Sequence, residues 1–128
     1  MERAAEVFAA LHCLVIGLSH VAHPAAWVEF FIWLRGKGKV GVFVNGFLSL
    51  AFGSIIVAFH NVWVGLPAIL TVLGWLQVTK GLLSFVAPQI AMKSLNRVSP
   101  ERSGEFVWAG VVLLTLSGLF WFLVFSNR

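Results

Sequence analysis

A glutamine and a lysine interrupt an otherwise apolar run, TVLGWLQVTKGLLSFVAP, at residues 71–88. Gln77 and Lys80 are three residues apart, so in a helix their side chains project from one face. Burying a cation at the centre of a membrane helix costs at least ~2.5–3.5 kcal/mol on insertion scales. A lysine kept at such a cost usually meets a partner or a ligand. Lys80 is therefore the candidate centre of a site for an anionic or strongly polar group.

Polar residues in three other apolar segments fall at depths near that of Lys80, and the ammonium group of Lys80 has three alternative partners or positions. The first is an internal ion pair between Lys80 and Glu105. A second is an external anion, such as a lipid phosphate or a small solute. A third is structural, in which the long side chain of Lys80 simply extends to the membrane surface. The candidate ligand-binding residues are Lys80, Gln77, Ser19, His20, Asn45 and Glu105.

The histidines form one recognisable spacing, H-x-x-H at His20 and His23, which places two rings one helical turn apart. A helix can offer such a pair to one metal ion, but two ligands are too few. Paired haem ligation needs histidines at similar depth, and His12 and His60 lie at different depths. We expect no cofactor, and keep a metal ion at His20 and His23, or a haem, as alternatives.

Enzyme signatures are missing from the chain, which contains no aspartate, no Ser–His–Asp set, no phosphate loop and no metalloprotease motif. Its single cysteine, Cys13, cannot form an internal disulfide, which argues against thiol–disulfide chemistry within one chain. We therefore expect a non-enzymatic protein, although a catalytic role stays open.

The composition indicates an integral membrane protein. Of 128 residues, 59% are hydrophobic and 11% are charged, whereas a soluble domain carries about 25% charged residues. The mean hydropathy is +0.93. The length suits a single membrane domain, 1–128. Since no basic patch alternates with aromatic residues, we expect no nucleic-acid partner.

Four segments are long and apolar enough to span a bilayer, which takes ~20 residues. They are 4–23, 41–60, 67–87 and 105–125. The sequence SPER at 99–102 resembles a helix N-cap followed by proline, and predicts that the last helix begins there.

Two connecting segments, 24–40 and 88–102, are predicted to lie in the membrane interface. The first presents an apolar face at helical spacing and then three cations, which is typical of an interfacial helix. That face consists of Trp27, Phe30, Phe31 and Leu34. The second has a weaker face, made of Ala91, Ser94, Leu95 and Val98.

The two halves of the chain share the same order of helices, prolines and glycines, which predicts an internal repeat of 1–64 and 65–128. Each half has a helix, a proline, an interfacial segment, and a second helix with an inner glycine. A shift of 64 residues superimposes Gly17, Leu18, Pro24, Gly46 and Leu50 on Gly81, Leu82, Pro88, Gly110 and Leu114. Because each unit has two spans, both insert with the same orientation.

Lys and Arg residues predict the orientation, because short cytoplasmic loops are rich in them. The two interfacial segments hold Arg35, Lys37, Lys39, Lys93, Arg97 and Arg102, whereas the opposite side holds Arg3 and Arg128. We expect the interfacial helices in the cytoplasm and both termini outside.

The second half, KGLLSFVAP followed by SLNRVSPERSGEFVWAGVVLLTLSG, resembles a family of small two-helix bacterial inner-membrane proteins of unknown function. The resemblance covers about 45 residues: a charged residue with glycine, a proline about seven residues later, a basic amphipathic linker and a glycine-containing helix. Lys80 stands where the family typically has an acid. The resemblance implies a bacterial inner membrane and transfers no activity.

The sequence thus predicts an all-α integral membrane protein, a four-helix transmembrane bundle built from two parallel two-helix repeats, each with a cytoplasmic interfacial helix. Glycine and serine share one face of each span, which favours close helix packing. We expect the chain to self-associate or to serve as an accessory subunit of a membrane complex. The alternatives are a small oligomeric transporter or anion-conducting pore, and a lipid or quinone binder that uses the polar stripe around Lys80. Expected partners are membrane lipids and other membrane subunits or further copies of the chain.

Overall fold

The computed structural model describes residues 1–126, which fold into six α-helices and one 3-10 turn, with no strand among them. The four long helices are α1 (Glu2–Ala22), α3 (Lys39–Phe59), α4 (Ala68–Val86) and α6 (Gly104–Phe125). The shorter elements are α2 (Pro24–Gly36), α5 (Pro88–Asn96) and the 3-10 turn η1 (Pro100–Arg102).

All four long helices are long and apolar enough to cross a membrane. This confirms the four candidate spans, and the predicted ends agree with the helices to within two residues. The predicted helix start at SPER is confirmed in part, since Ser99 precedes a helical turn with proline at its first position and the last candidate span runs from Pro100 to Phe125. The amides of Arg102 and Ser103 bond three residues back, to the carbonyls of Ser99 and Pro100. This bonding tightens the segment into a separate 3-10 turn, and α6 begins only at Gly104.

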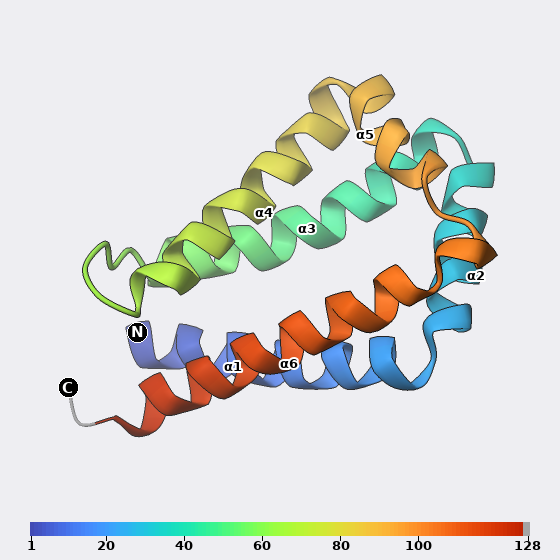
Figure 1. The fold of residues 1–128 in the computed structure, drawn as a ribbon. Coiled ribbons are helices and arrows are strands. Elements are labelled where there is room, and N and C mark those ends of the chain that lie inside the picture. Colours follow the sequence, from blue (N-terminus) through green and yellow to red (C-terminus); the bar gives the residue numbers. More distant parts are fainter. Residues whose placement is uncertain (127–128) are drawn as a thin grey trace.

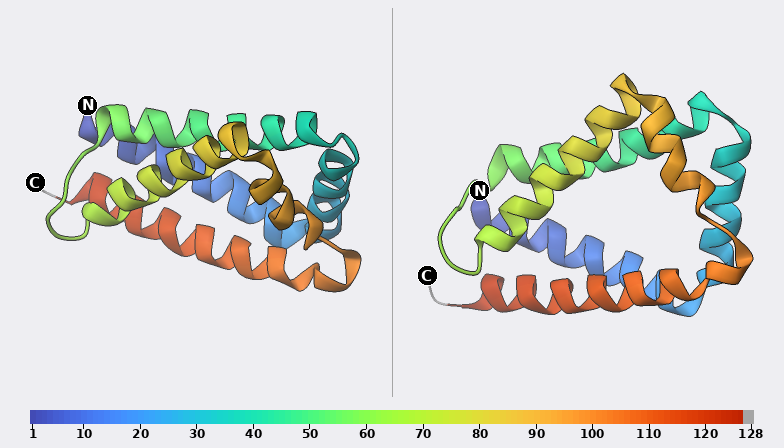
Figure 2. Two further views of the ribbon diagram at one scale, coloured as in Figure 1. Left: turned by 90° about the horizontal axis from the view of Figure 1, so that it is seen from above. Right: turned by 45° about the horizontal axis from the view of Figure 1, so that its top comes forward.

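The long helices form two pairs, α1 with α6 and α3 with α4 (Figure 1). The pairs converge where the N-terminus, the end of α6 and the connection between α3 and α4 lie, which we call the narrow end. They diverge toward the wide end, where α2 and α5 run across the gap (Figure 2). The bundle is therefore wedge-shaped.

Glycines let the helices of each pair touch. A Cβ placed on Gly110 of α6 would lie 2.8 Å from the carbonyl oxygen of Gly17 in α1. A Cβ on Gly81 of α4 would lie 3.1 Å from the carbonyl oxygen of Gly46 in α3. Glycine and serine faces therefore serve the packing of helices within one chain. Among residues 1–126, the hydroxyl of Ser117 also donates to the carbonyl of Ala10, at 2.8 Å.

The main apolar core lies toward the narrow end and draws on all four long helices. Its buried members are Ala5, Ala9, Ala10, Cys13, Ile56, Leu70, Phe120 and Leu123. A second, smaller cluster at the wide end joins α2, α3 and α5 through Leu34, Val42 and Leu95.

Proline ends the first long helix of each half at the wide end. Residues His23 and Ala87, which precede Pro24 and Pro88, have closely similar backbone angles, φ −134° and ψ 55° against φ −132° and ψ 66°. A proline lacks the amide hydrogen and crowds the preceding turn, so the helix stops there. The chain then turns into α2 and α5.

Candidate functional site

A cavity of about 250 Å³ lies between the two helix pairs, and we call it the inter-pair cavity. Residues from α1, α2, α3, α4 and α6 line it. Its polar lining consists of His12, His20, Ser49, Gln77 and Lys80. Its aromatic lining consists of Trp27, Phe31 and Phe52, with aliphatic side chains completing the wall. His12, Leu48 and Lys80 are exposed, so the cavity is open to the surroundings.

Three of the six predicted ligand-binding residues meet at this cavity: Lys80, Gln77 and His20. Ser19 contributes indirectly, because its hydroxyl accepts a hydrogen bond of 2.9 Å from the indole Nε1 of Trp27. That bond holds the indole ring at the cavity wall. Asn45 instead lines a second cavity of about 270 Å³ between α3, α4 and α5.

Glu105 lies apart from the other candidates. Its carboxylate accepts a hydrogen bond of 2.8 Å from Nη2 of Arg97, and both side chains are exposed. The structure therefore pairs Glu105 with Arg97 rather than with Lys80. The physical reason is position, since Arg97 follows the C-terminus of α5 close to the start of α6, whereas Lys80 lies within α4 in the other helix pair.

Lys80 lies between the two cavities and lines both of them. Within residues 1–126, Glu6 lies against the ring of His60 and Glu105 pairs with Arg97, and no carboxylate pairs with the ammonium group of Lys80. An anion or a polar oxygen bound in either cavity would therefore lie next to the ammonium group of Lys80. The lysine that stood out in the sequence is thus at the centre of the candidate site.

His20 and His23 do not act as a pair. The ring of His20 is buried, stacks on Trp27 with a centroid distance of 4.3 Å, and donates from Nδ1 to the carbonyl of Ile16 at 2.8 Å. His23 is exposed at the end of α1. Within the part of the chain that the structure describes, no three His, Cys, Asp or Glu side chains gather as a metal would require.

A buried polar cluster at the narrow end was missed in the sequence. Glu6, His60 and Thr71 are each 0% exposed and come from α1, the end of α3 and the start of α4. The Nε2 atom of His60 lies 3.3 Å from a carboxylate oxygen of Glu6, and Nδ1 lies 2.9 Å from the hydroxyl of Thr71. An acid four residues inside an apolar helix was the available signal.

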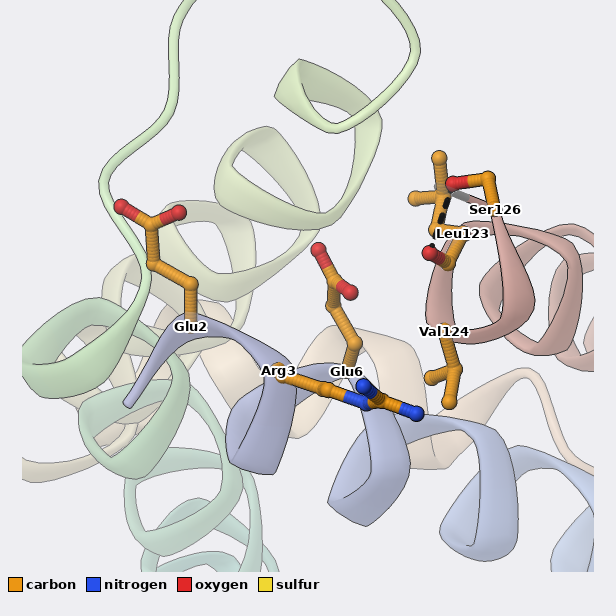
Figure 3. Close-up of a pocket in the computed structure, with 6 residues that line it drawn as sticks. All are labelled: Glu2, Arg3, Glu6, Leu123, Val124 and Ser126. Atoms are coloured by element: carbon orange, nitrogen blue, oxygen red, sulfur yellow. Dashed lines mark hydrogen bonds between the residues drawn. The ribbon is translucent and has the colours of Figure 1, made fainter. Parts of the chain in front are cut away.

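Figure 3 shows the residues that line a pocket next to His60 and Thr71, with Glu6 of the cluster in its wall. Glu2, Arg3 and Glu6 from the first turns of α1 line it together with Leu123, Val124 and Ser126 from the end of α6. Its volume is about 260 Å³. Glu2 and Arg3 are exposed, whereas Glu6 is buried. The pocket therefore brings exposed charges up to the edge of the buried cluster.

Comparison of the chain with protein-family models, curated proteins and solved structures gives no match. The fold itself defines an all-helical chain with four apolar helices of membrane-spanning length.

Proposed function

We propose that this chain is an integral membrane protein that binds an amphiphilic molecule in the inter-pair cavity. The observation that carries the proposal is the position of Lys80, which meets Gln77 and His20 in a cavity otherwise lined by apolar and aromatic side chains. An anionic or polar head would lie against the ammonium group of Lys80. Lipids, fatty acids and quinones share this combination of an oxygen-bearing head with an apolar body.

The size of the cavity supports binding by the head. Pockets that enclose a whole small molecule usually measure about 300–1,000 Å³, and this one measures about 250 Å³. The apolar body of a lipid would therefore extend past Leu48, which is exposed, along the apolar helix surfaces. Where water is scarce, a hydrogen bond between an ammonium group and an anionic head is stronger than one between neutral groups.

Native mass spectrometry of protein purified with its lipids tests the proposal. Lys80→Met keeps the apolar stem and removes the charge, and we expect it to fold and to lose the bound anionic amphiphile. Lys39→Met is the matched control, because Lys39 is exposed at the start of α3 and lines neither cavity. Equal retention of the amphiphile by both variants and the parent would contradict the proposal.

A second candidate is a small oligomeric transporter or an anion-conducting pore. The position of Lys80 between two cavities favours it. The apolar core and the buried polar cluster fill the narrow end, so a conducting path through the monomer would have to open there. Anion flux into liposomes can be measured for the parent and for Lys80→Met. If Lys80→Met abolishes the flux but keeps any co-purified lipid, transport is favoured over binding of an amphiphile.

Self-association, or a place in a larger membrane complex, stays a proposal of its own. The glycine and serine faces that motivated it already pack within the monomer, so support for it now rests on the many apolar side chains that the four spans expose. Native mass spectrometry in lipid nanodiscs that shows a dimer would support it.

We also propose that the two halves of the chain are an internal repeat with a common orientation in a bacterial inner membrane. The element order, the two proline breaks and the reciprocal glycine contacts support the repeat. The transverse course of α2 and α5 across the wide end supports interfacial helices on one side of the membrane (Figure 2).

A further inference from the structure

A second polar site lies at the wide end, at the connection between α5 and α6. A depression of about 390 Å³ is lined by Lys93, Asn96, Arg97, Ser99 and Arg102, and we call it the basic pocket. Three of its five lining residues are cations, and the other two carry side-chain groups that donate hydrogen bonds. None of the five lines the inter-pair cavity.

The backbone that carries these residues is held in place. Arg35 of α2 reaches across with one guanidinium nitrogen, Nη1, which lies 3.2 Å from the carbonyl oxygen of Leu95 and 2.8 Å from that of Val98. Leu95 is itself buried against α2 and α3. The backbone is thus anchored on both sides of Asn96 and Arg97.

The charge balance of the basic pocket favours an anion. Glu105 contacts Arg97 through Nη2, but a guanidinium group has five N–H donors and can bind a second acceptor. Glu101 belongs to η1 and is exposed. Against these two carboxylates stand Lys93, Arg97 and Arg102 in the pocket, so the local charge is positive.

Exposed tryptophans place the basic pocket at the level of lipid headgroups. Trp108, one turn after Glu105 in α6, is 72% exposed, and Trp33 of α2 is 56% exposed. Exposed tryptophans of membrane proteins concentrate where the bilayer meets water. The ammonium group of Lys37 lies 5.4 Å from the centre of the Trp33 ring, so cations and indole rings share this level. Lipid phosphates lie at the same depth.

We propose that the basic pocket binds the phosphate of a lipid whose headgroup carries a net negative charge. Arg97 and Arg102 contact the phosphate oxygens, Lys93 adds its charge, and Asn96 and Ser99 donate neutral hydrogen bonds. A zwitterionic choline headgroup brings its own cation into the pocket and is disfavoured. This site is independent of the inter-pair cavity, so the failure of either proposal leaves the other intact.

The test compares two double variants in nanodiscs that contain phosphatidylcholine with or without phosphatidylglycerol. Arg97→Gln with Arg102→Gln removes two cations of the pocket, and Lys37→Gln with Lys39→Gln removes two cations at the same end outside it. General attraction to an anionic surface falls equally in both. We expect the pocket variant to bind phosphatidylglycerol at least about tenfold more weakly than the control, as the loss of charge-assisted hydrogen bonds implies.

A single variant that should bind phosphatidylglycerol more tightly separates loss of the site from loss of folding, because a misfolded protein would not gain affinity. Glu105→Gln removes the carboxylate that competes for Arg97, and we expect it to bind phosphatidylglycerol more tightly than the parent. Equal losses in the two double variants would overturn the proposal, because only general charge would then act. Binding of inorganic phosphate by the parent in phosphatidylcholine nanodiscs, with no preference for phosphatidylglycerol, would overturn the assignment to a lipid.

Discussion

The hydroxyl of Thr71 connects three groups at the narrow end. It lies 2.9 Å from Nδ1 of His60, accepts a hydrogen bond of 3.0 Å from the backbone amide of Val62, and lies 3.4 Å from the carbonyl oxygen of His60. His60 in turn contacts Glu6 of α1. One buried hydroxyl therefore links the connection between α3 and α4 to the first helix.

Replacing Thr71 by valine keeps the shape of the side chain and removes these bonds. We expect a loss of about 1–3 kcal/mol in the free energy of unfolding, because the buried ring of His60 and the partly buried amide of Val62 lose a partner. Thr115→Val is the matched control. Thr115 is exposed, and its hydroxyl bonds to the carbonyl of Val111 in its own helix. Unfolding in mixed detergent micelles measures both, and equal stability of the two variants would contradict the role of the cluster.

The candidate site could be predicted only in part from the sequence. Lys80 and Gln77 stood out because a cation inside an apolar helix is costly and their spacing puts them on one face. Glu6 and His60 did not, because they lie near helix ends, where sequence alone suggests contact with water. Their burial depends on helices that are distant in the chain, and nothing in the local sequence encodes it.

At the scale of elements, glycines determine how closely the helices of each pair pack. Gly17 of the first half meets Gly110 of the second, and Gly81 of the second meets Gly46 of the first. These four positions are two pairs related by the 64-residue shift. Each half therefore supplies one helix to each pair, so neither half buries its own glycine faces alone.

Replacing Gly81 by alanine should disturb the α3–α4 pair. The new Cβ would lie 2.7 Å from the Cβ of Leu50 and 3.0 Å from its Cα, so the helices must separate. We expect a loss of about 1–3 kcal/mol, the usual cost of overpacking. Gly118→Ala is the control, since a Cβ there meets no atom within 4 Å. If the two substitutions prove equally harmless in thermal unfolding, the close approach is not what stabilises the pair.

The extents of the long helices could be predicted well, since membrane spans have a characteristic length and proline marks their ends. Their pairing could not. A glycine face permits close approach but does not specify which helix approaches. The same faces were compatible with contacts between copies of the chain, and only the folded arrangement shows that they pack inside it.

In the whole molecule, most Lys and Arg residues lie at the wide end of the wedge. Arg35, Lys37 and Lys39 lie at the wide end with Lys93, Arg97 and Arg102, whereas Arg3 lies at the narrow end with the N-terminus (Figure 1). Arg128, the other cation predicted opposite the interfacial segments, lies outside the described residues. Since short cytoplasmic loops are rich in Lys and Arg, this separation favours the wide end in the cytoplasm.

Accessibility of single cysteines tests that orientation. In a Cys13→Ala background, we expect Ser126→Cys to react with a membrane-impermeant maleimide in intact cells and Ser99→Cys to react only after lysis. Both serines are partly exposed, so access rather than burial decides the result. Labelling of position 99 from outside intact cells would contradict this orientation.

Photocrosslinking of a fatty acid that carries its diazirine beside the carboxylate reports where the head of an amphiphile rests, and so tests whether the inter-pair cavity binds it. We expect adducts at Leu48, Phe52 and Leu73 of the inter-pair cavity, and we expect Lys80→Met to remove them. Adducts confined to the outward-facing residues Val15, Val112 and Phe122, unchanged by Lys80→Met, would contradict this expectation.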